Sequence, residues 1–136
     1  MLGVTPWLAD CDFVSHHFDD GIPFEEAFSH SSMPATLVKD VGFRKSHTTG
    51  KPVLLSISAL DLSRKQKAAY YRDAPETPDE VKARWTELPF DHPDIIMAYT
   101  NYIRWLAGQF QPAWINYGVE SNLALIPEIS SCQYLE

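Results

Sequence analysis

The chain has 136 residues, of which 45% are hydrophobic and 21% charged, a composition typical of one soluble globular domain with its own core. Its formal net charge is −7 at pH 7, and its densest basic cluster lies at residues 64–67, so nucleic-acid binding through a basic face is disfavoured. No run of 18 or more apolar residues predicts a membrane span, and residues 1–7 lack the basic and apolar regions of an export signal. We therefore expect no membrane partner. The compartment stays open, because a complete protein could still be secreted.

The first half of the chain predicts two strands and two helices. A strand is expected over residues 12–18, followed by a loop and a short helix over 24–28 with acidic residues in its first turn. Pro34 suits the first position of a second helix, over residues 34–46. The near-continuous apolar run at residues 51–58 is typical of a parallel strand that is buried on both faces.

The second half begins with a long mixed segment, residues 59–90, whose length and content of Arg, Tyr and Trp are typical of a binding loop. A capping-box pattern at residues 77–80 predicts a short helix ending near Trp85, and residues 63–71 are expected to add a helical turn or two. Helical spacing over residues 91–109 gives one continuous apolar face: Ile95, Tyr99, Tyr102, Ile103, Leu106 and Phe110. A helix joined by a short connection to a buried strand is the order found in βαβ units.

The strand after that helix carries the residue on which a function can be built. Pro112 stops the helix, and the alternation that follows places Ile115, Tyr117 and Val119 on one apolar face. The other face is partly polar and ends in a carboxylate: Trp114, Asn116, Gly118 and Glu120. Polar groups at the C-terminal end of a strand are typical of the active site of a (β/α)8 barrel. Glu120 is therefore a candidate catalytic residue, and a glutamate in a surface turn is the alternative.

Two groups of side chains have the chemistry of metal ligands. Cys11 and Cys132 lie too far apart for a zinc pattern, and we expect two buried free thiols. The second group ends the first predicted strand: His16, His17, Asp19 and Asp20. Adjacent residues of a strand point to opposite faces, so no more than two of these four readily share an ion. A polar strand end at the rim of a pocket is the preferred interpretation, and we expect no metal and no cofactor.

Several stretches together resemble a known family. Residues 110–122 (FQPAWINYGVESN), after a helix that contains AYTNY at residues 98–102, resemble the fourth strand of a clan A glycoside hydrolase barrel. The nearest resemblance is to the arabinogalactan endo-beta-1,4-galactanases of family 53. Residues 12–24 resemble an earlier strand with its loop, and residues 52–57 resemble the strand between them. The resemblance implies an α/β fold, a partial (β/α)8 barrel of about three parallel strands with their helices.

The resemblance also implies a chemistry. In that family the fourth-strand glutamate is the acid/base and a seventh-strand glutamate is the nucleophile, and retaining enzymes hold two such carboxyls about 5–5.5 Å apart. Glu120 matches the first role by position. The family has asparagine before that glutamate, where this chain has Val119, so the usual contact with the sugar 2-hydroxyl needs a substitute, for which Asn116 or Asn122 is the candidate.

Further substrate contacts are expected from residues elsewhere in the chain. His16, His17 and Asp19 end one parallel strand as Glu120 ends another, so we expect all four at the same end of the sheet. Trp85 either stacks on a sugar ring or belongs to the core.

The length of the chain predicts an incomplete barrel. A complete barrel takes about 200–250 residues, and only Glu128 and Glu136 follow Glu120, so a seventh-strand nucleophile is missing. We expect one partial-barrel domain over residues 1–136, corresponding to strands two to four, with a self-contained small α/β domain as the alternative. The isolated chain should be inactive and should self-associate through open sheet edges. The expected function is retaining hydrolysis of polysaccharide by the complete protein; the alternative is a non-catalytic carbohydrate-binding or scaffold protein.

Overall fold

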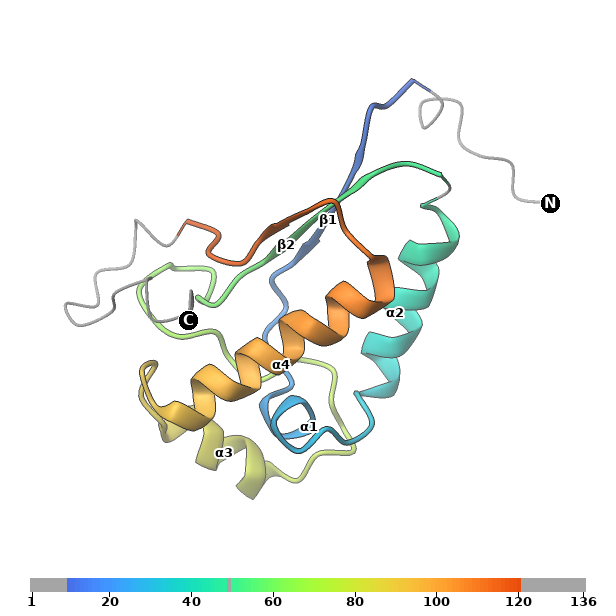
Figure 1. The fold of residues 1–136 in the computed structure, drawn as a ribbon. Coiled ribbons are helices and arrows are strands. Elements are labelled where there is room, and N and C mark those ends of the chain that lie inside the picture. The colour runs from blue at the N-terminus through green and yellow to red at the C-terminus, as the bar shows by residue number, and fades with distance from the viewer. Residues whose placement is uncertain (1–9, 49, 121–136) are drawn as a thin grey trace.

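In the computed structural model, which describes residues 10–48 and 50–120, three parallel strands form one sheet with helices against one of its faces (Figure 1). The strands lie in the order β1-β2-β3: β1 is Val14–Phe18, β2 is Val53–Ile57 and β3 is Trp114–Asn116. The described helices are α1 at Phe24–Ser29, α2 at Ala35–Ser46, α3 at Asp79–Glu87 and α4 at Pro93–Phe110. The expected α/β architecture with a parallel sheet is confirmed.

The position of β2 at the centre of the sheet accounts for its apolar sequence. It pairs with β1 from Val14↔Val53 to Phe18↔Ile57, and with β3 from Leu54↔Trp114 to Ser56↔Asn116. Four of its five residues are buried, as its apolar run predicts for a strand flanked on both sides. The edge strand β1 instead alternates between inward and outward residues towards its C-terminal end.

The helices α1 and α2 begin close to where the sequence predicts them. Pro34 precedes α2 as its N-cap, and Leu37 and Val41 turn inward from that helix. The expected helical turns at residues 63–71 are absent. Bends occupy residues 64–66, with φ of 61° at Arg64, and two isolated bridges hold the segment, Leu60 with Lys67 and Ile22 with Tyr70.

The helix α3 starts without the expected capping box. Its N-cap is Pro78, and no side chain accepts a hydrogen bond from its first turn. The hydroxyl of Thr77 donates instead to the buried carboxylate of Glu26, 51 residues earlier in the chain. A tertiary partner for Thr77 has therefore replaced the local one.

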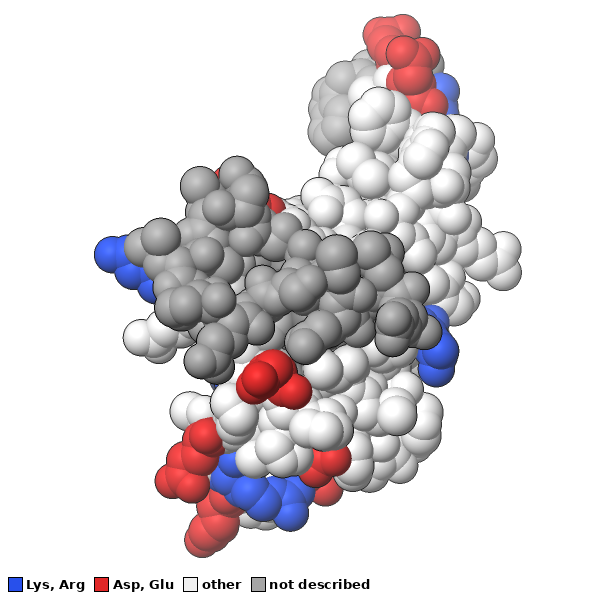
Figure 2. Space-filling model, turned by 60° about the vertical axis from the view of Figure 1, so that its left-hand side comes forward, with Lys and Arg blue, Asp and Glu red and all other residues white. Residues whose placement is uncertain are grey.

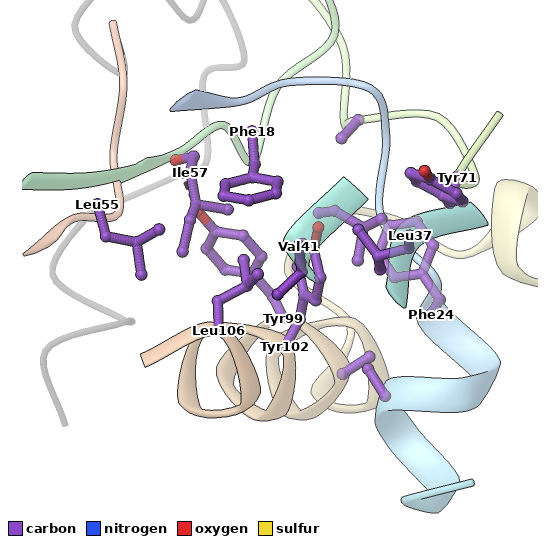
Figure 3. Close-up of a cluster of buried hydrophobic side chains, with 14 of the residues drawn as sticks. Phe18, Phe24, Leu37, Val41, Leu55, Ile57, Tyr71, Tyr99, Tyr102 and Leu106 are labelled. Atoms are coloured by element: carbon purple, nitrogen blue, oxygen red, sulfur yellow. Dashed lines mark hydrogen bonds between the residues drawn. The ribbon is translucent and has the colours of Figure 1, made fainter. Parts of the chain in front are cut away.

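The helix α4 supplies much of the core. Its first turn is capped by His92, whose Nδ1 accepts from the Asp94 N–H at 3.1 Å. Figure 3 shows Tyr99, Tyr102 and Leu106 meeting the strand residues Phe18, Leu55 and Ile57 in one apolar cluster. The inward face of the helix is Ile95, Ala98, Tyr99, Asn101, Tyr102, Leu106 and Phe110, which confirms the predicted stripe except at the partly buried Ile103. Complete burial of each large apolar side chain contributes about 1.5–3 kcal/mol.

The strand β3 is shorter and more exposed than the sequence predicts. It ends at Asn116, and Trp114 and Ile115 are 54% and 42% exposed. The chain then leaves the sheet, and Glu120 lies in a turn with φ of 54°. The expectation of a buried strand reaching Glu120 is wrong, because β3 lies at the edge and pairs with β2 alone in the described residues. None of the helices within residues 10–48 and 50–120 has both the length and the hydrophobicity needed to cross a bilayer.

Candidate functional site

The polar candidate residues gather at the C-terminal edge of the sheet. Strand pairing aligns His17 with Ser56 and Ser56 with Asn116. Asp19 follows the end of β1, and Glu120 follows β3 after a short turn. Because the strands are parallel, His17, Asp19 and Glu120 lie at the same end of the sheet, as expected.

The face of the sheet opposite the helices, which we call the open face, has two unlike halves. At its N-terminal end Phe13 and Trp114 meet edge to face, with ring centroids 5.9 Å apart and planes at 71°. Both rings remain about half exposed, at 47% and 54%. At its C-terminal end the open face carries the polar residues His17, Ser56 and Asn116, of which Ser56 is buried. The open face thus changes from apolar to polar along the direction of the strands.

A pocket of about 460 Å³ opens between the loops that follow β1 and β2. Its polar lining consists of Asp19, Asp20, Asp61, Ser63, Tyr70 and Arg72. Arg72 pairs with Asp20 at 3.5 Å, and the Nε2 of His17 lies 3.4 Å from a carboxylate oxygen of Asp19. The hydroxyl of Ser63 lowers the pKa of the Asp61 carboxyl by donating to it. Convergent polar groups on a partly apolar wall are the usual make-up of a small-molecule pocket.

Glu120 forms an ion pair with Arg64 at the same end of the sheet. The Nε of Arg64 lies 2.5 Å from Oε2 of Glu120, and the side chains are 16% and 52% exposed. The Nη1 of Arg64 also donates to the Asp61 carbonyl at 2.9 Å, so the loop after β2 holds the guanidinium in place. The charged hydrogen bond orients the carboxylate of Glu120. Sequence reasoning missed Arg64 as a partner, because its one signal was a weak basic cluster.

His16 lies on the opposite face of β1 from His17. It is only 8% exposed, its ring centroid is 4.7 Å from that of Phe110, and its Nε2 is 2.6 Å from the Thr48 hydroxyl. That hydroxyl donates to the Arg44 carbonyl, so it accepts from the His16 ring. Burial lowers the pKa of His16, the Arg44 charge lowers it further, and Asp40 acts in the opposite direction. Alternation along the strand turns the His16 side chain towards the helices and away from His17, so the structure does not bring these two expected contacts together.

Trp85 belongs to the core. It is 2% exposed and stacks on Phe24, with centroids 5.8 Å apart and planes at 11°. Its indole N–H donates to a carboxylate oxygen of Glu25 at 2.6 Å. Stacking on a sugar is therefore wrong for Trp85, because neither face of the ring is open to a ligand.

Of the remaining candidate residues, the structure describes Asn116 and Cys11 only. Asn116 is exposed at the polar end of the open face, and its role stays a prediction. Cys11 is partly exposed, contrary to the expected burial. Asn122 and Cys132 lie outside the described residues. Among the residues that are described, no three His, Cys, Asp or Glu side chains are grouped so that they could hold a metal ion.

A buried carboxylate is the feature that sequence reasoning missed most clearly. Glu26 is 7% exposed and accepts hydrogen bonds from the hydroxyls of Tyr70, at 2.5 Å, and Thr77. Burial raises the pKa of Tyr70, and the bond to Glu26 adds to the effect. The available signal was the position of Glu26 between Phe24 and Ala27, on the inward face of a short helix.

The basic cluster at residues 64–67 does not form a charged surface. Its Lys67 donates to the carbonyls of Trp85 and Leu88 at 2.6 and 2.7 Å, which caps the end of α3, and burial lowers the pKa of the Lys67 ammonium. Figure 2 shows acidic and basic side chains mixed at the lower end of the visible face, over α1 and α3. On the described part of this face, basic side chains thus lie among acidic ones and not in a continuous patch.

Comparison with known proteins found no protein-family model, no curated protein and no solved structure that matches the chain.

Proposed function

We propose that the chain is a section, strands two to four, of a glycoside hydrolase-like (β/α)8 barrel of the family 53 galactanase type. In the complete protein, Glu120 would be the acid/base for retaining hydrolysis of polysaccharide. The open face is the observation that carries this proposal. The interior of such a barrel is filled with bulky side chains and opens into the active site at the C-terminal ends of its strands. The aromatic pair Phe13 and Trp114 at one end, and His17 and Asn116 at the other, have that order.

The environment of the sheet supports the same proposal. Parallel sheets occur almost only with both faces covered, whereas the described helices cover one. Phe13 and Trp114 would be buried by further barrel strands. Both β1 and β3 have one unpaired side in the described residues, where neighbouring strands of a barrel would pair.

The proposed chemistry uses the groups at the C-terminal edge. A sugar in the pocket between the loops would be held by hydrogen bonds to Asp19, Asp61 and Ser63. Arg64 would fix the position of the Glu120 carboxyl, which would protonate the leaving glycosidic oxygen and later activate a water molecule. The nucleophilic carboxylate would come from a later strand of the complete barrel.

A second candidate is a carbohydrate-binding protein without catalysis. The Glu120–Arg64 ion pair is the observation that favours it, because it occupies the carboxylate oxygen that an acid/base would use. A glutamate held in this way is well suited to accept hydrogen bonds from sugar hydroxyls. Val119, in place of the family's asparagine, points in the same direction.

The test uses the complete reading frame and β-1,4-galactan as the probe. Hydrolysis that releases products with retained anomeric configuration, and that is lost in Glu120→Gln but not in Glu80→Gln, is the result expected. Galactan binding without hydrolysis, measured by titration calorimetry and weakened by Glu120→Gln, would favour the non-catalytic candidate. Neither binding nor hydrolysis of β-1,4-galactan would contradict the galactanase-type proposal.

A further inference from the structure

The outer edge of β1 is already occupied at one point by a side chain. The Val14 N–H donates to the Pro52 carbonyl, and the Phe18 carbonyl accepts from the Ser58 N–H, so these residues direct their backbone groups towards β2. The intervening residues Ser15 and His17 direct theirs outward, as alternation along a strand requires. The carbonyl of His17 accepts a hydrogen bond of 2.9 Å from Nη1 of Arg44, which projects from α2.

Arg44 is held in this position by three contacts. Its Nε donates to a carboxylate oxygen of Asp40 at 3.0 Å, and its guanidinium carbon lies 4.2 Å from the ring centroid of Phe18. With the bond to the His17 carbonyl, the planar group is engaged at both its edge and its face, and its side chain is 26% exposed. A guanidinium combines such contacts because its donors are rigidly arranged and its face is weakly hydrated.

We propose that Arg44 blocks the outer edge of β1 and so prevents strand addition by a second copy of this chain. Unpaired strand edges bind other chains through backbone hydrogen bonds, which do not depend on sequence. The only other open edge in the described sheet is that of β3, where Trp114 and Ile115 expose apolar surface. This edge of one copy and the β1 edge of the next have complementary backbone groups and apolar surroundings, since Phe13 and Phe43 line a pocket beside β1.

The block at this edge has a consequence for assembly, because pairing there could add copies of the chain without limit. Pairing of β3 in one copy with β1 in the next is a head-to-tail contact, which repeats and produces filaments unless its rotation closes a ring. With Arg44 bound to the His17 carbonyl, an incoming strand loses one backbone partner and must displace a guanidinium. Self-association is then restricted to β3 against β3, a two-fold contact that ends at a dimer. In a complete barrel a preceding strand would pair along this edge, so the inference applies to the 136-residue chain itself and does not rest on the proposed function.

The test compares Arg44→Met with the matched control Lys39→Met in the full 136-residue chain. Methionine keeps a long apolar stem over Phe18 but has no donor, and both substitutions remove one positive charge from α2. Sedimentation velocity at increasing protein concentration should show wild type and Lys39→Met no larger than a dimer. The average mass of Arg44→Met should continue to rise beyond the dimer.

A second substitution identifies the edge involved. Ser15→Pro removes an outward N–H without removing a bond to β2, a position at which edge strands tolerate proline. In the Arg44→Met background it should restore the wild-type size distribution. Identical distributions for Arg44→Met and wild type would overturn the proposal, and so would large species that persist in the double variant.

The experiment stays decisive if Arg44→Met fails to fold, as judged by circular dichroism and thermal unfolding. Asp40→Asn then replaces it, because this variant keeps Arg44 but weakens the contact that anchors its Nε. It should shift the size distribution in the same direction by a smaller amount. A distribution equal to that of wild type would overturn the proposal.

Discussion

The hydroxyl of Tyr70 donates a 2.5 Å hydrogen bond to the carboxylate of Glu26, 44 residues earlier in the sequence. Thr77 donates to the other oxygen of the same carboxylate, and Glu25 accepts from the indole of Trp85. Two consecutive glutamates of α1 thus hold the C-terminal half of the long segment between β2 and α3, and α3 itself at Trp85. Because this segment forms one wall of the pocket, the shape of the candidate site depends on a buried carboxylate that does not itself line it.

Replacing Glu26 with alanine should strongly destabilise the fold. The change leaves the hydroxyls of Tyr70 and Thr77 without an acceptor, which costs about 1–3 kcal/mol for each group that stays buried. Urea unfolding followed by circular dichroism measures the loss. Glu80→Ala is the control, since that side chain is exposed on α3 and its replacement should change the free energy of unfolding by less than about 0.5 kcal/mol. Equal unfolding midpoints for the two variants would contradict the role given to Glu26.

Two glycines should respond to alanine in opposite directions. Gly21 has φ of +92°, and a Cβ there would lie 2.6 Å from the Tyr70 carbonyl oxygen, so Gly21→Ala should destabilise the fold and widen the pocket. Gly42 lies within α2 with no atom within 4 Å of an added Cβ, so Gly42→Ala should stabilise by about 0.4–1 kcal/mol. Thermal unfolding of both variants gives the comparison. A Gly21→Ala protein as stable as Gly42→Ala would show that the backbone contact at Tyr70 is absent.

The sequence predicted the regular elements because their signals are local. The apolar run of β2 and the helical spacing of α4 each specify an element and its inward face within one segment. The capping box predicted before α3 does not form, because the Thr77 hydroxyl donates to Glu26 instead. No local pattern in the sequence reveals that partner. The helical turns expected at residues 63–71 do not form, because bridges to the nearby Leu60 and the distant Ile22 hold Lys67 and Tyr70.

The candidate site was predictable only as far as strand geometry reaches. Parallel pairing was enough to place His17, Asp19 and Glu120 at one end of the sheet. It could not show that β3 stops at Asn116, nor that Arg64 reaches Glu120 from another loop, because both depend on tertiary contacts.

The stability of the fold should fall as the pH drops below about 6.5 because of His16. Its pKa is lowered from 6.5 in the folded chain, first by burial and then by the Arg44 charge, so folding favours the neutral ring. The stability is unaffected by this group above pH 6.5, and it declines as the pH falls from there towards the folded-state pKa, because the unfolded chain takes up the proton first. Urea midpoints measured from about pH 8 to about pH 5 should therefore decrease more in wild type than in His16→Phe.

The control for this pH dependence is His17→Gln. His17 lies on the exposed face of the same strand, so its replacement should leave the decrease at its wild-type size. A decrease that is unchanged in His16→Phe and lost in His17→Gln would contradict the assignment of the pH dependence to His16.

Substitution of Glu120 by glutamine in the complete protein should affect substrates according to their leaving groups. If Glu120 is the general acid, a polysaccharide substrate with a poor leaving group should lose about 10²–10⁴-fold in turnover, the usual contribution of a positioned proton donor. An activated aryl glycoside needs little protonation and should lose much less in the glycosylation step. Added azide should restore the second step, because it attacks without a general base. Steady-state rates for both substrate types, with and without azide, measure these effects. Under the same proposal the 136-residue chain alone should show no turnover, since the nucleophilic carboxylate would come from a later strand. Equal losses for both substrate types would instead give Glu120, together with Arg64, a role in binding sugar.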